Sequence, residues 1–269
     1  MLGKRKLRQI DLCSGVGAGF PLWGIITRKV ELCGLCETDE WCREILQQRF
    51  PDVPIYGDVR DLQLRKGEID CITSSPPCQP FTVEGKRLAA ADPRDCIPPV
   101  LRVVTTAQPK FFCLENVPGL LSAPRYPGDE PGTYFKQMLR QLQISGYDAQ
   151  WIVVGTRFHF GTRWSGKRLL LIATSGSLKF EWERATPWEH QVRSQSQETG
   201  NYQEERSIQS RMVGTGVWTA NRVDRSPGVP SGNPIIRARR AALGNILDPR
   251  IAAIAWERLL YLNGLVERG

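Results

Sequence analysis

Ile69–Phe81 reads Ile-Asp-Cys-Ile-Thr-Ser-Ser-Pro-Pro-Cys-Gln-Pro-Phe, and this stretch indicates what kind of sheet the chain forms. Its apolar start, residues 69–73, predicts a buried strand. The Pro76-Pro77 pair holds the loop after that strand, because each proline fixes its φ angle and has no N–H to donate. Cys78 follows at once, at the carboxyl edge of the sheet, where open α/β sheets bind ligands. A thiol held there predicts a nucleophile; the alternative is a turn with an incidental buried cysteine.

Strand-like and helix-like segments alternate on both sides of this stretch. Short apolar runs predict strands, and longer runs with apolar residues every three to four positions predict helices. Gly146 is suited to end the last of these helices, because glycine readily takes the left-handed conformation of a C-cap. Such alternation is typical of an α/β fold with a doubly wound, mostly parallel sheet. The expected strands are 7–12, 30–36, 55–59, 69–73, 111–114, 151–154 and 169–173, and the expected helices are 40–50, 99–107 and 134–145.

The composition changes near Ser175 and predicts a second, smaller domain. Residues 175–236 are polar, rich in Gln, Ser, Arg and Gly, and show no clear period. Scattered tryptophans in this segment need burial or a ligand, which argues for a small irregular domain rather than disorder. A helical pattern returns over 235–265. We therefore expect a main domain of residues 1–174 plus 237–269, with residues 175–236 folded separately.

The composition favours a soluble, cytoplasmic protein with an anionic partner. The chain has 36 Lys plus Arg and 28 Asp plus Glu, a net charge of +8. This charge favours nucleic acid as the partner, although a basic protein with no such partner can have the same charge. No apolar run approaches the roughly 18 residues of a membrane span, and no secretory signal core precedes the first strand. The eight cysteines are therefore expected to be reduced. Cys33 and Cys36 have metal-site spacing but lack a second pair of ligands, so we expect no metal.

A glycine-rich loop, Asp11–Gly19, follows the first strand. Its glycines allow a tight turn and let a ligand approach the backbone. Glu37 follows the second strand, where dinucleotide folds place an acid on ribose hydroxyls, and Asp58 follows the third, where it could accept from an adenine amino group. Each residue alone is more often an ordinary loop residue. Together the three strand ends predict a site for a nucleotide-like cofactor.

Glu115 gives the thiol a partner. The Glu115-Asn116-Val117 tripeptide ends the strand predicted at 111–114, which neighbours the Cys78 strand in a regular sheet order. A carboxyl beside an apolar elbow has a raised pKa and can donate a proton. The alternative is a glutamate that caps a helix. A thiol and a proton donor at adjacent strand tips predict that both act on one substrate.

These motifs, in this order, resemble the DNA cytosine carbon-5 methyltransferase family of bacterial or phage type. The resemblance covers residues 7–174 and 235–265, and it is most specific in Pro77–Phe81 paired with Glu115–Leu120. Amino-group methyltransferases carry an aromatic residue where Cys78 stands. Further matches, to the family's mobile catalytic loop and to its last motif, are Gly85-Lys86-Arg87, Asp92-Pro93-Arg94 and Gly244-Asn245-Ile246-Leu247.

The resemblance implies a catalytic mechanism and a cofactor. Cys78 would add to carbon 6 of a cytosine flipped out of the double helix, Glu115 would contact the ring nitrogen and the amino group, and Arg168 would anchor the base. The methyl group would come from S-adenosylmethionine. Taken alone, Trp41 is more often a core aromatic. The residues that the resemblance places at this cofactor are Asp11, Cys13, Gly15, Gly17, Glu37, Trp41, Asp58, Val59, Pro77, Asn245 and Leu247.

The resemblance also implies a DNA surface, with residues 175–236 as the target-recognition domain. We expect a monomer that acts on double-stranded DNA in the cytoplasm of a bacterium or a phage-infected host, as restriction–modification methyltransferases do. The residues placed on DNA are Gln79, Thr82, Lys86, Arg87, Arg94, Arg237, Arg239 and Arg240.

The chain departs from the family's pattern at three places. Cys13 stands where phenylalanine is usual, and Thr82 where serine is usual. The family's Gln-x-Arg-x-Arg is here Trp164–Arg168, which keeps the last arginine alone. Because alternate residues of a strand share a face, we expect Arg168 and not Lys167 to face the flipped base. Two alternatives stay open: a DNA-binding homologue that has lost catalysis, and a tRNA cytosine methyltransferase, although the Cys-Phe-Thr tripeptide of that branch is absent.

Overall fold

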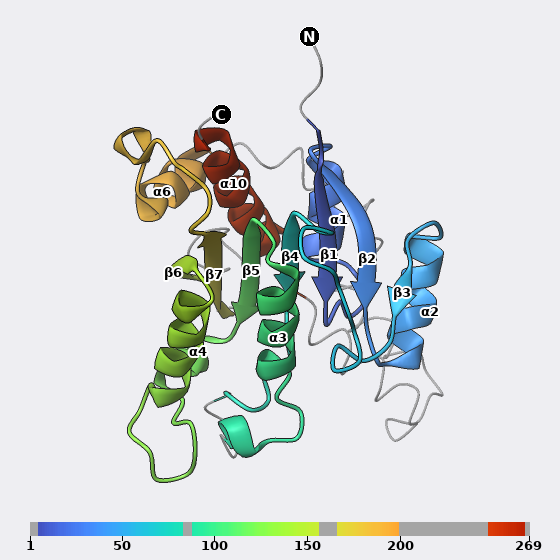
Figure 1. Ribbon diagram of the computed structural model, residues 1–269, viewed down its shortest axis with the longest axis vertical. Coiled ribbons are helices and arrows are strands. Elements are labelled where there is room, and N and C mark those ends of the chain that lie inside the picture. Colours follow the sequence, from blue (N-terminus) through green and yellow to red (C-terminus); the bar gives the residue numbers. More distant parts are fainter. Residues whose placement is uncertain (1–4, 83–87, 156–165, 199–246, 267–269) are drawn as a thin grey trace, which may run out of the picture.

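A seven-stranded sheet forms the centre of the molecule, in a computed structural model that describes residues 5–82, 88–155, 166–198 and 247–266 (Figure 1). The strand order is β3-β2-β1-β4-β5-β7-β6. β7 runs antiparallel to both of its neighbours and the other pairs are parallel, which confirms the mostly parallel α/β fold. The strands are β1 (Leu7–Leu12), β2 (Val30–Cys36), β3 (Ile55–Tyr56), β4 (Cys71–Ser74), β5 (Phe111–Asn116), β6 (Tyr147–Gly155) and β7 (Lys167–Ser175).

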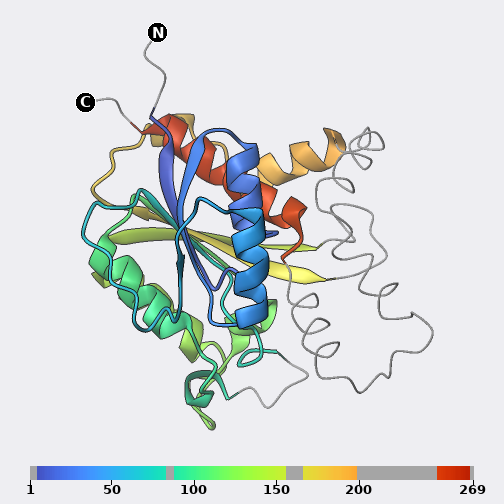
Figure 2. The same ribbon diagram turned by 90° about the vertical axis from the view of Figure 1, so that its right-hand side faces the viewer.

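Helices cover both faces of this sheet. Figure 2 shows α1 (Phe20–Ile26), α2 (Glu40–Arg49) and α10 (Pro249–Leu265) on one face, and α3 (Ile97–Ala107) and α4 (Thr133–Ile144) on the other. The order of the strands reverses at β1, because β2 and β3 lie on one side of it and β4 and β5 on the other. Doubly wound sheets bind ligands at the carboxyl ends of the strands beside such a reversal. The remaining described elements are η1 (Ala89–Ala91), η2 (Pro118–Ser122), η3 (Trp182–Arg184) and α6 (Trp188–Glu198).

Every residue of β4 and β5 is buried, because each face of these central strands meets a layer of helices. In β5, Phe111 and Cys113 belong to the core under α1 and α10, whereas Phe112 and Leu114 belong to the core under α3 and α4. On the first of these faces the Trp256 indole N–H donates to the carbonyl of Phe20 at 3.0 Å and joins α10 to α1. The C-terminal helix is therefore part of the main core.

Local signals in the sequence explain where the helices begin and end. The Asp39 carboxylate accepts from the N–H of Cys42 at 2.9 Å and caps α2. Asp248 caps α10 in the same way, and Pro249 follows it at the first helical position, where a missing N–H costs nothing. Beyond the end of α4, Gly146 has a φ of +83°, which confirms its predicted role.

Some predicted boundaries were wrong. β3 is limited to two residues because the chain turns directly after Gly57, where the N–H of Asp61 donates to the carbonyl of Asp58 at 3.0 Å. β6 begins at Tyr147 rather than at 151, since polar residues on the exposed side of this edge strand hide its start. α3 begins at Ile97, so that two prolines occupy its first turn.

The described residues after Ser175 pack on α10. Phe180 pairs with Val266, and the N–H of Glu181 donates to the carbonyl of Leu265 at 3.0 Å. The expectation of no periodicity was wrong over α6, where Trp188 and Val192 are buried one turn apart on an otherwise polar helix. The division of the chain into two domains stays a prediction.

Arg258 of α10 fixes the start of this segment. Its guanidinium is buried and donates to the carbonyl of Thr186 at 2.7 Å and to the side-chain oxygens of Gln150 and Gln191 at 3.0 and 3.2 Å. Among the described residues, no helix is both long and apolar enough to cross a membrane.

Candidate active site

The tips of β4 and β5 bring the predicted thiol and carboxyl together. The two strands pair in parallel up to Ser74 and Leu114. Beyond them, the Asn116 amide donates to the carbonyl of Pro76 at 3.2 Å and ties one tip to the other. The elbow itself is tight, because the N–H groups of the two residues after Pro80 both donate to the carbonyl of Cys78, at 2.9 and 3.0 Å.

Glu115 is buried beside one arginine. Its side chain is 9% exposed, and the Arg168 guanidinium Nε lies 2.9 Å from its Oε1. Burial raises the pKa of Glu115 to about 7, against the opposing charge of Arg168 and a hydrogen bond from Ser75. The raised pKa agrees with the expectation from the sequence, and proton donation by Glu115 stays a prediction.

Cys78 is half-buried and rests as a thiol. Burial raises its pKa, and the nearby Glu115 carboxyl raises it further, while Arg168 acts in the opposite direction. The adjacent Gln79 has a buried side-chain oxygen with no hydrogen-bond partner among the described residues. Buried acceptors normally have a donor, so this oxygen is suited to a group that arrives with a ligand. Thr82 closes the turn with a hydroxyl 3.4 Å from the carbonyl of Gln79.

The two basic residues at the start of β7 differ in their environment. Arg168 reaches Glu115, whereas Lys167 is exposed, in agreement with the alternation of side chains along a strand. Trp164, the first residue of the altered arginine motif, lies outside the described residues. Arg168 is thus the one basic side chain of β7 that the structure brings to the thiol and carboxyl.

Glu37 shapes the glycine-rich loop from the tip of the neighbouring strand. Its carboxylate accepts from the N–H of Gly15 at 2.7 Å, and also from the N–H groups of Thr38 and Asp39 at 2.8 and 2.9 Å. These bonds fix the loop across the β1–β2 gap. These three donors leave acceptor capacity on the carboxylate, so a contact of Glu37 with a cofactor stays a prediction.

Two glycines of the loop have positive φ angles but different surroundings. At Gly17, with φ +73°, a Cβ atom would lie 2.6 Å from the ring of Phe50, so the fold itself needs glycine there. At Gly15, with φ +54°, the place of a Cβ atom is open. A ligand can therefore approach the backbone at Gly15. Trp41 packs against Val16 and Ala18 of the same loop.

Asp11 lies beneath the loop in a buried polar network. Gln9 donates to the Thr73 hydroxyl at 2.8 Å, and that hydroxyl donates to the Asp11 carboxylate. Burial raises the pKa of Asp11 to about 7, although the hydroxyl bonds lower it in part. Asp11 is thus a buried acid that retains its proton to near neutral pH.

Asp58 is held by an arginine that sequence analysis did not single out. Its carboxylate accepts from the Arg60 guanidinium, with Oδ2 3.1 Å from Nη1, and from the Arg60 N–H at 2.8 Å. Val59 is buried between them. Leu247 lies against the loop, since a Cβ atom added at Gly19 would be 2.9 Å from it. The C-terminal segment therefore returns to the predicted cofactor loop.

Arg94 is preorganised by its neighbour. The Asp92 carboxylate receives two parallel bonds from the Arg94 guanidinium, at 2.9 and 2.7 Å, and these bonds lower the pKa of Asp92 to about 2. The Arg94 side chain stays 59% exposed. Pro77 is half-buried at the elbow. Outside the described residues lie Lys86, Arg87, Arg237, Arg239, Arg240 and Asn245.

Sequence analysis missed the residues that support the elbow from below. The buried Tyr134 hydroxyl donates to Asp95 at 2.5 Å, and the Tyr134 ring meets the Phe81 ring edge-on with centroids 4.9 Å apart. The elbow is therefore packed on α4 and joined to the start of α3. No local pattern signals these contacts, because each joins segments distant in sequence.

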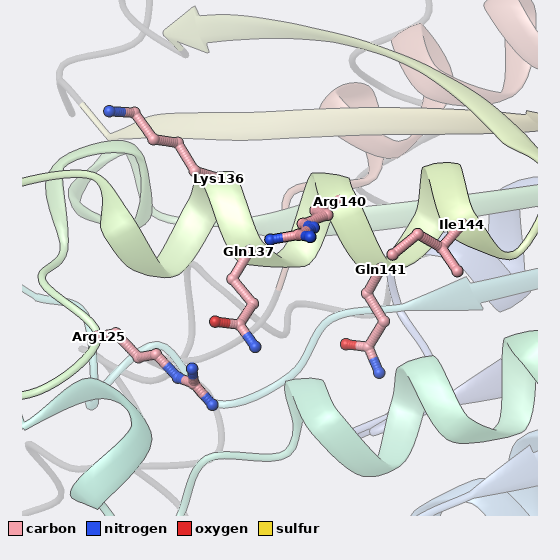
Figure 3. A pocket seen from close by; sticks show the side chains of 6 residues that line it. All are labelled: Arg125, Lys136, Gln137, Arg140, Gln141 and Ile144. Atoms are coloured by element: carbon pink, nitrogen blue, oxygen red, sulfur yellow. The ribbon is translucent and has the colours of Figure 1, made fainter.

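A separate hollow of about 600 Å³ lies beside α4, and Figure 3 shows the side chains that line it. Its lining contains no residue of the predicted site and no carboxylate; the residues are Arg125, Lys136, Gln137, Arg140, Gln141 and Ile144. Within the described ranges, no group of three or more His, Cys, Asp and Glu side chains is placed to hold a metal ion.

Comparison with known proteins identifies the family. The C-5 cytosine-specific DNA methylase family matches residues 7–227, most of the chain. The chain belongs to the C-5 cytosine-specific DNA methylase family. The matched region contains both strand tips and the glycine-rich loop.

Curated relatives of this chain include bacterial type II methyltransferases. It is 32% identical over 184 residues to M.NlaIV of Neisseria lactamica, a match that covers 65% of this chain and 42% of M.NlaIV. It is 26% identical over 265 residues to M.NgoMIV of Neisseria gonorrhoeae, covering 96% of this chain and 78% of M.NgoMIV. The chain thus spans less than half the length of the first of these relatives.

Solved structures show the same fold at low sequence identity. The S. pombe Dnmt2 methyltransferase superposes with a TM-score of 0.61 and 15% identity, covering 96% of this chain and 99% of that one. A mutant of Spodoptera frugiperda DNMT2 gives a TM-score of 0.53 and 21% identity, covering 68% of this chain and 54% of that one.

The raised pKa of Asp11 predicts how stability depends on pH. The folded state holds this proton more tightly than the unfolded chain does, so the free energy of unfolding falls as pH rises from about 4 to about 7. One such group contributes a slope of about 1 kcal/mol per pH unit in that window. Asp11→Asn should flatten the slope by that amount in urea unfolding at a series of pH values. Asp52→Asn, at an exposed turn, is the matched control and should keep the wild-type slope. An unchanged slope in Asp11→Asn would contradict the buried acid.

Proposed function

We propose that this protein is a DNA (cytosine-5-)methyltransferase, which transfers a methyl group from S-adenosylmethionine to carbon 5 of cytosine in double-stranded DNA. The observation that carries the proposal is the grouping of Cys78 with the Glu115–Arg168 pair at adjacent strand tips. Membership of the C-5 cytosine-specific DNA methylase family and the printed names of the type II relatives support it.

Cys78 acts as the nucleophile. Carbon 5 of cytosine is a weak nucleophile, and addition of a thiolate at carbon 6 converts the ring to an enamine whose carbon 5 accepts the methyl group. Loss of the carbon-5 proton then restores the double bond and expels the Cys78 thiolate. Because the pKa of Cys78 is raised, the thiol loses its proton to solvent as it adds to carbon 6 of the bound cytosine.

Glu115 supplies the proton that the addition requires. As carbon 6 is attacked, negative charge develops at the ring nitrogen opposite, and a carboxyl with a pKa of about 7 is matched to donate there at neutral pH. Arg168 holds the Glu115 carboxyl in place at 2.9 Å and keeps part of its guanidinium for the base. The Gln79 side-chain oxygen, which has no partner among the described residues, offers an acceptor next to Cys78 in the chain.

Cytosine must leave the helix to meet these groups. A base stacked inside a duplex cannot bring carbon 6 to a thiol within an elbow, so the target is flipped out; methyltransferases are among the enzymes known to flip bases. Arg94, held by Asp92 and still exposed, is suited to the phosphate backbone. Residues 175–236 form the target-recognition domain of this proposal, and the protein acts as a monomer in the cytoplasm.

The loop after β1 is suited to S-adenosylmethionine, which supplies the methyl group when bound. The open space at Gly15 lets a ligand lie against the backbone, and Leu247 closes the far side of the loop. Trp41 offers an apolar surface beside it. Asp58 shares its carboxylate with Arg60, so an amino group of the cofactor would join an existing ion pair.

Transfer of labelled methyl groups tests this function directly. Wild-type protein should label double-stranded DNA, with the label in 5-methylcytosine, and should not label tRNA. Cys78→Ser should abolish transfer, because a hydroxyl is a far weaker nucleophile, while retaining DNA binding in a filter or mobility assay. Labelling of tRNA alone, or DNA binding with no transfer by the wild type, would favour the tRNA enzyme or the inactive homologue instead.

The two basic residues of β7 provide a matched pair of variants. Arg168→Ala should lower turnover on DNA by at least about two orders of magnitude, roughly the 3 kcal/mol that one preorganised polar contact supplies. Lys167→Ala should have a mild effect, because its side chain faces solvent. Steady-state kinetics of both variants checks this order, and the reverse order would mean that Lys167 and not Arg168 serves the site.

A further inference from the structure

Two cysteines of the cofactor region meet in space. Cys13 follows β1, and Cys96 lies directly before α3, yet their thiols are close enough that each shifts the pKa of the other. Both side chains pack against the core under α3 and α4, and both remain partly accessible. Neither takes part in the chemistry proposed for Cys78. The pair therefore joins the glycine-rich loop to the start of α3 through two free thiols.

Arg60 stands beside this pair. Its guanidinium Nη2 lies 3.9 Å from the sulfur of Cys96 and 3.1 Å from the carbonyl of Pro93, while Nη1 binds Asp58. The guanidinium is thereby held against the Cys96 sulfur by contacts on both of its arms. A fixed cation beside a sulfur favours the thiolate.

The electrostatics single out Cys96 among the eight cysteines, all of which are described. The neighbouring Cys13 thiol and the charge of Arg60 lower the pKa of Cys96 to about 7, although burial, Asp58 and Asp95 act in the opposite direction. The other seven cysteines all have raised pKa values. Burial is the largest cause at six of them, whereas the neighbouring Cys96 is the largest cause at Cys13. Cys96, and not Cys78, has the largest thiolate fraction at neutral pH.

We propose that Cys13 and Cys96 form a reversible disulfide when the protein meets a peroxide. The Cys96 thiolate attacks one oxygen of hydrogen peroxide, the O–O bond breaks, and a sulfenic acid forms as hydroxide leaves and takes a proton. The Cys13 sulfur then attacks the sulfenic sulfur, the S–S bond forms and water leaves. In total two thiols and one hydrogen peroxide give one disulfide and two waters, and the two sulfurs lose the two electrons that the peroxide gains.

The disulfide would lock the loop after β1 to the start of α3. Cys13 has a φ of +58°, unusual for a residue other than glycine, and lies two residues before Gly15. A covalent bond at this point restricts the backbone that a ligand approaches. A second part of the proposal rests on the proposed function. Oxidation and S-adenosylmethionine binding oppose each other, because both engage the loop after β1.

Peptide mapping tests the disulfide without reference to activity. The full-length protein is treated with hydrogen peroxide at pH 7, its free thiols are blocked with iodoacetamide, and the digest is analysed by mass spectrometry. We expect a peptide in which Cys13 and Cys96 are linked by a disulfide that dithiothreitol reduces. Cys78 should be found alkylated by iodoacetamide. Cys96→Ser should abolish the link, and Cys33→Ser, at a partly exposed thiol of β2, should retain it.

Three results would overturn the disulfide. These are Cys13 and Cys96 both blocked as free thiols, Cys96 oxidised to sulfinic acid with Cys13 intact, and Cys78 in the linked peptide. If Cys96→Ser fails to fold, a second measurement on the wild type replaces it. Limiting iodoacetamide at pH 7 should label Cys96 several-fold faster than Cys78, and the opposite order would contradict the proposal.

The cofactor analogue S-adenosylhomocysteine separates the disulfide from the proposed function. It should slow the appearance of the Cys13–Cys96 peptide, and the oxidised protein should bind it more weakly in calorimetry, with affinity restored by dithiothreitol. If the disulfide forms at the same rate with and without a bound analogue, the Cys13–Cys96 disulfide is supported, but its opposition to cofactor binding is contradicted. Failure of the reduced protein to bind the analogue would instead count against the proposed function.

Discussion

The parallel pairing of β4 with β5 is the constraint on which the site depends. It brings two strand tips side by side at the edge of the sheet, and the Asn116 amide bond to Pro76 holds the loop of one against the other. The three side chains proposed for the methyl transfer all depend on that junction. Cys78 comes from one tip and Glu115 from the other. Because β7 runs antiparallel to β5, the start of β7 lies beside Glu115 and contributes Arg168.

Much of the fold was predictable because most residues of the central strands are buried, so that short, largely apolar runs mark these strands in the sequence. β1, β2 and the core of β5 were predicted in this way, as was the end of α4 at Gly146. The failures have physical reasons too. β6 is an edge strand whose first residues are polar, and α6 buries two residues on a background of glutamine and serine, so neither presents a strong period.

The candidate site divides in the same way. Cys78, Glu115 and the glycine-rich loop could be found because each follows a strand at the expected edge, and their neighbourhood follows from the order of the strands. The supporting contacts could not be found, since Tyr134 with Asp95 and Arg60 with Cys96 join segments that no local pattern relates. The bonds from the Glu37 carboxylate to backbone N–H groups could not be predicted either, and its contact with a cofactor stays a prediction.

Covalent trapping tests the central claim most directly. DNA that carries 5-fluorocytosine in place of cytosine stops the reaction after methyl transfer, because fluorine cannot leave carbon 5 as a cation and the thiol cannot be expelled. With S-adenosylmethionine present, the wild-type protein should form a complex with this DNA that survives denaturation, and peptide mapping should locate the bond at Cys78. A complex through another cysteine, Cys96 above all, or no complex from a protein that methylates ordinary DNA, would contradict the account.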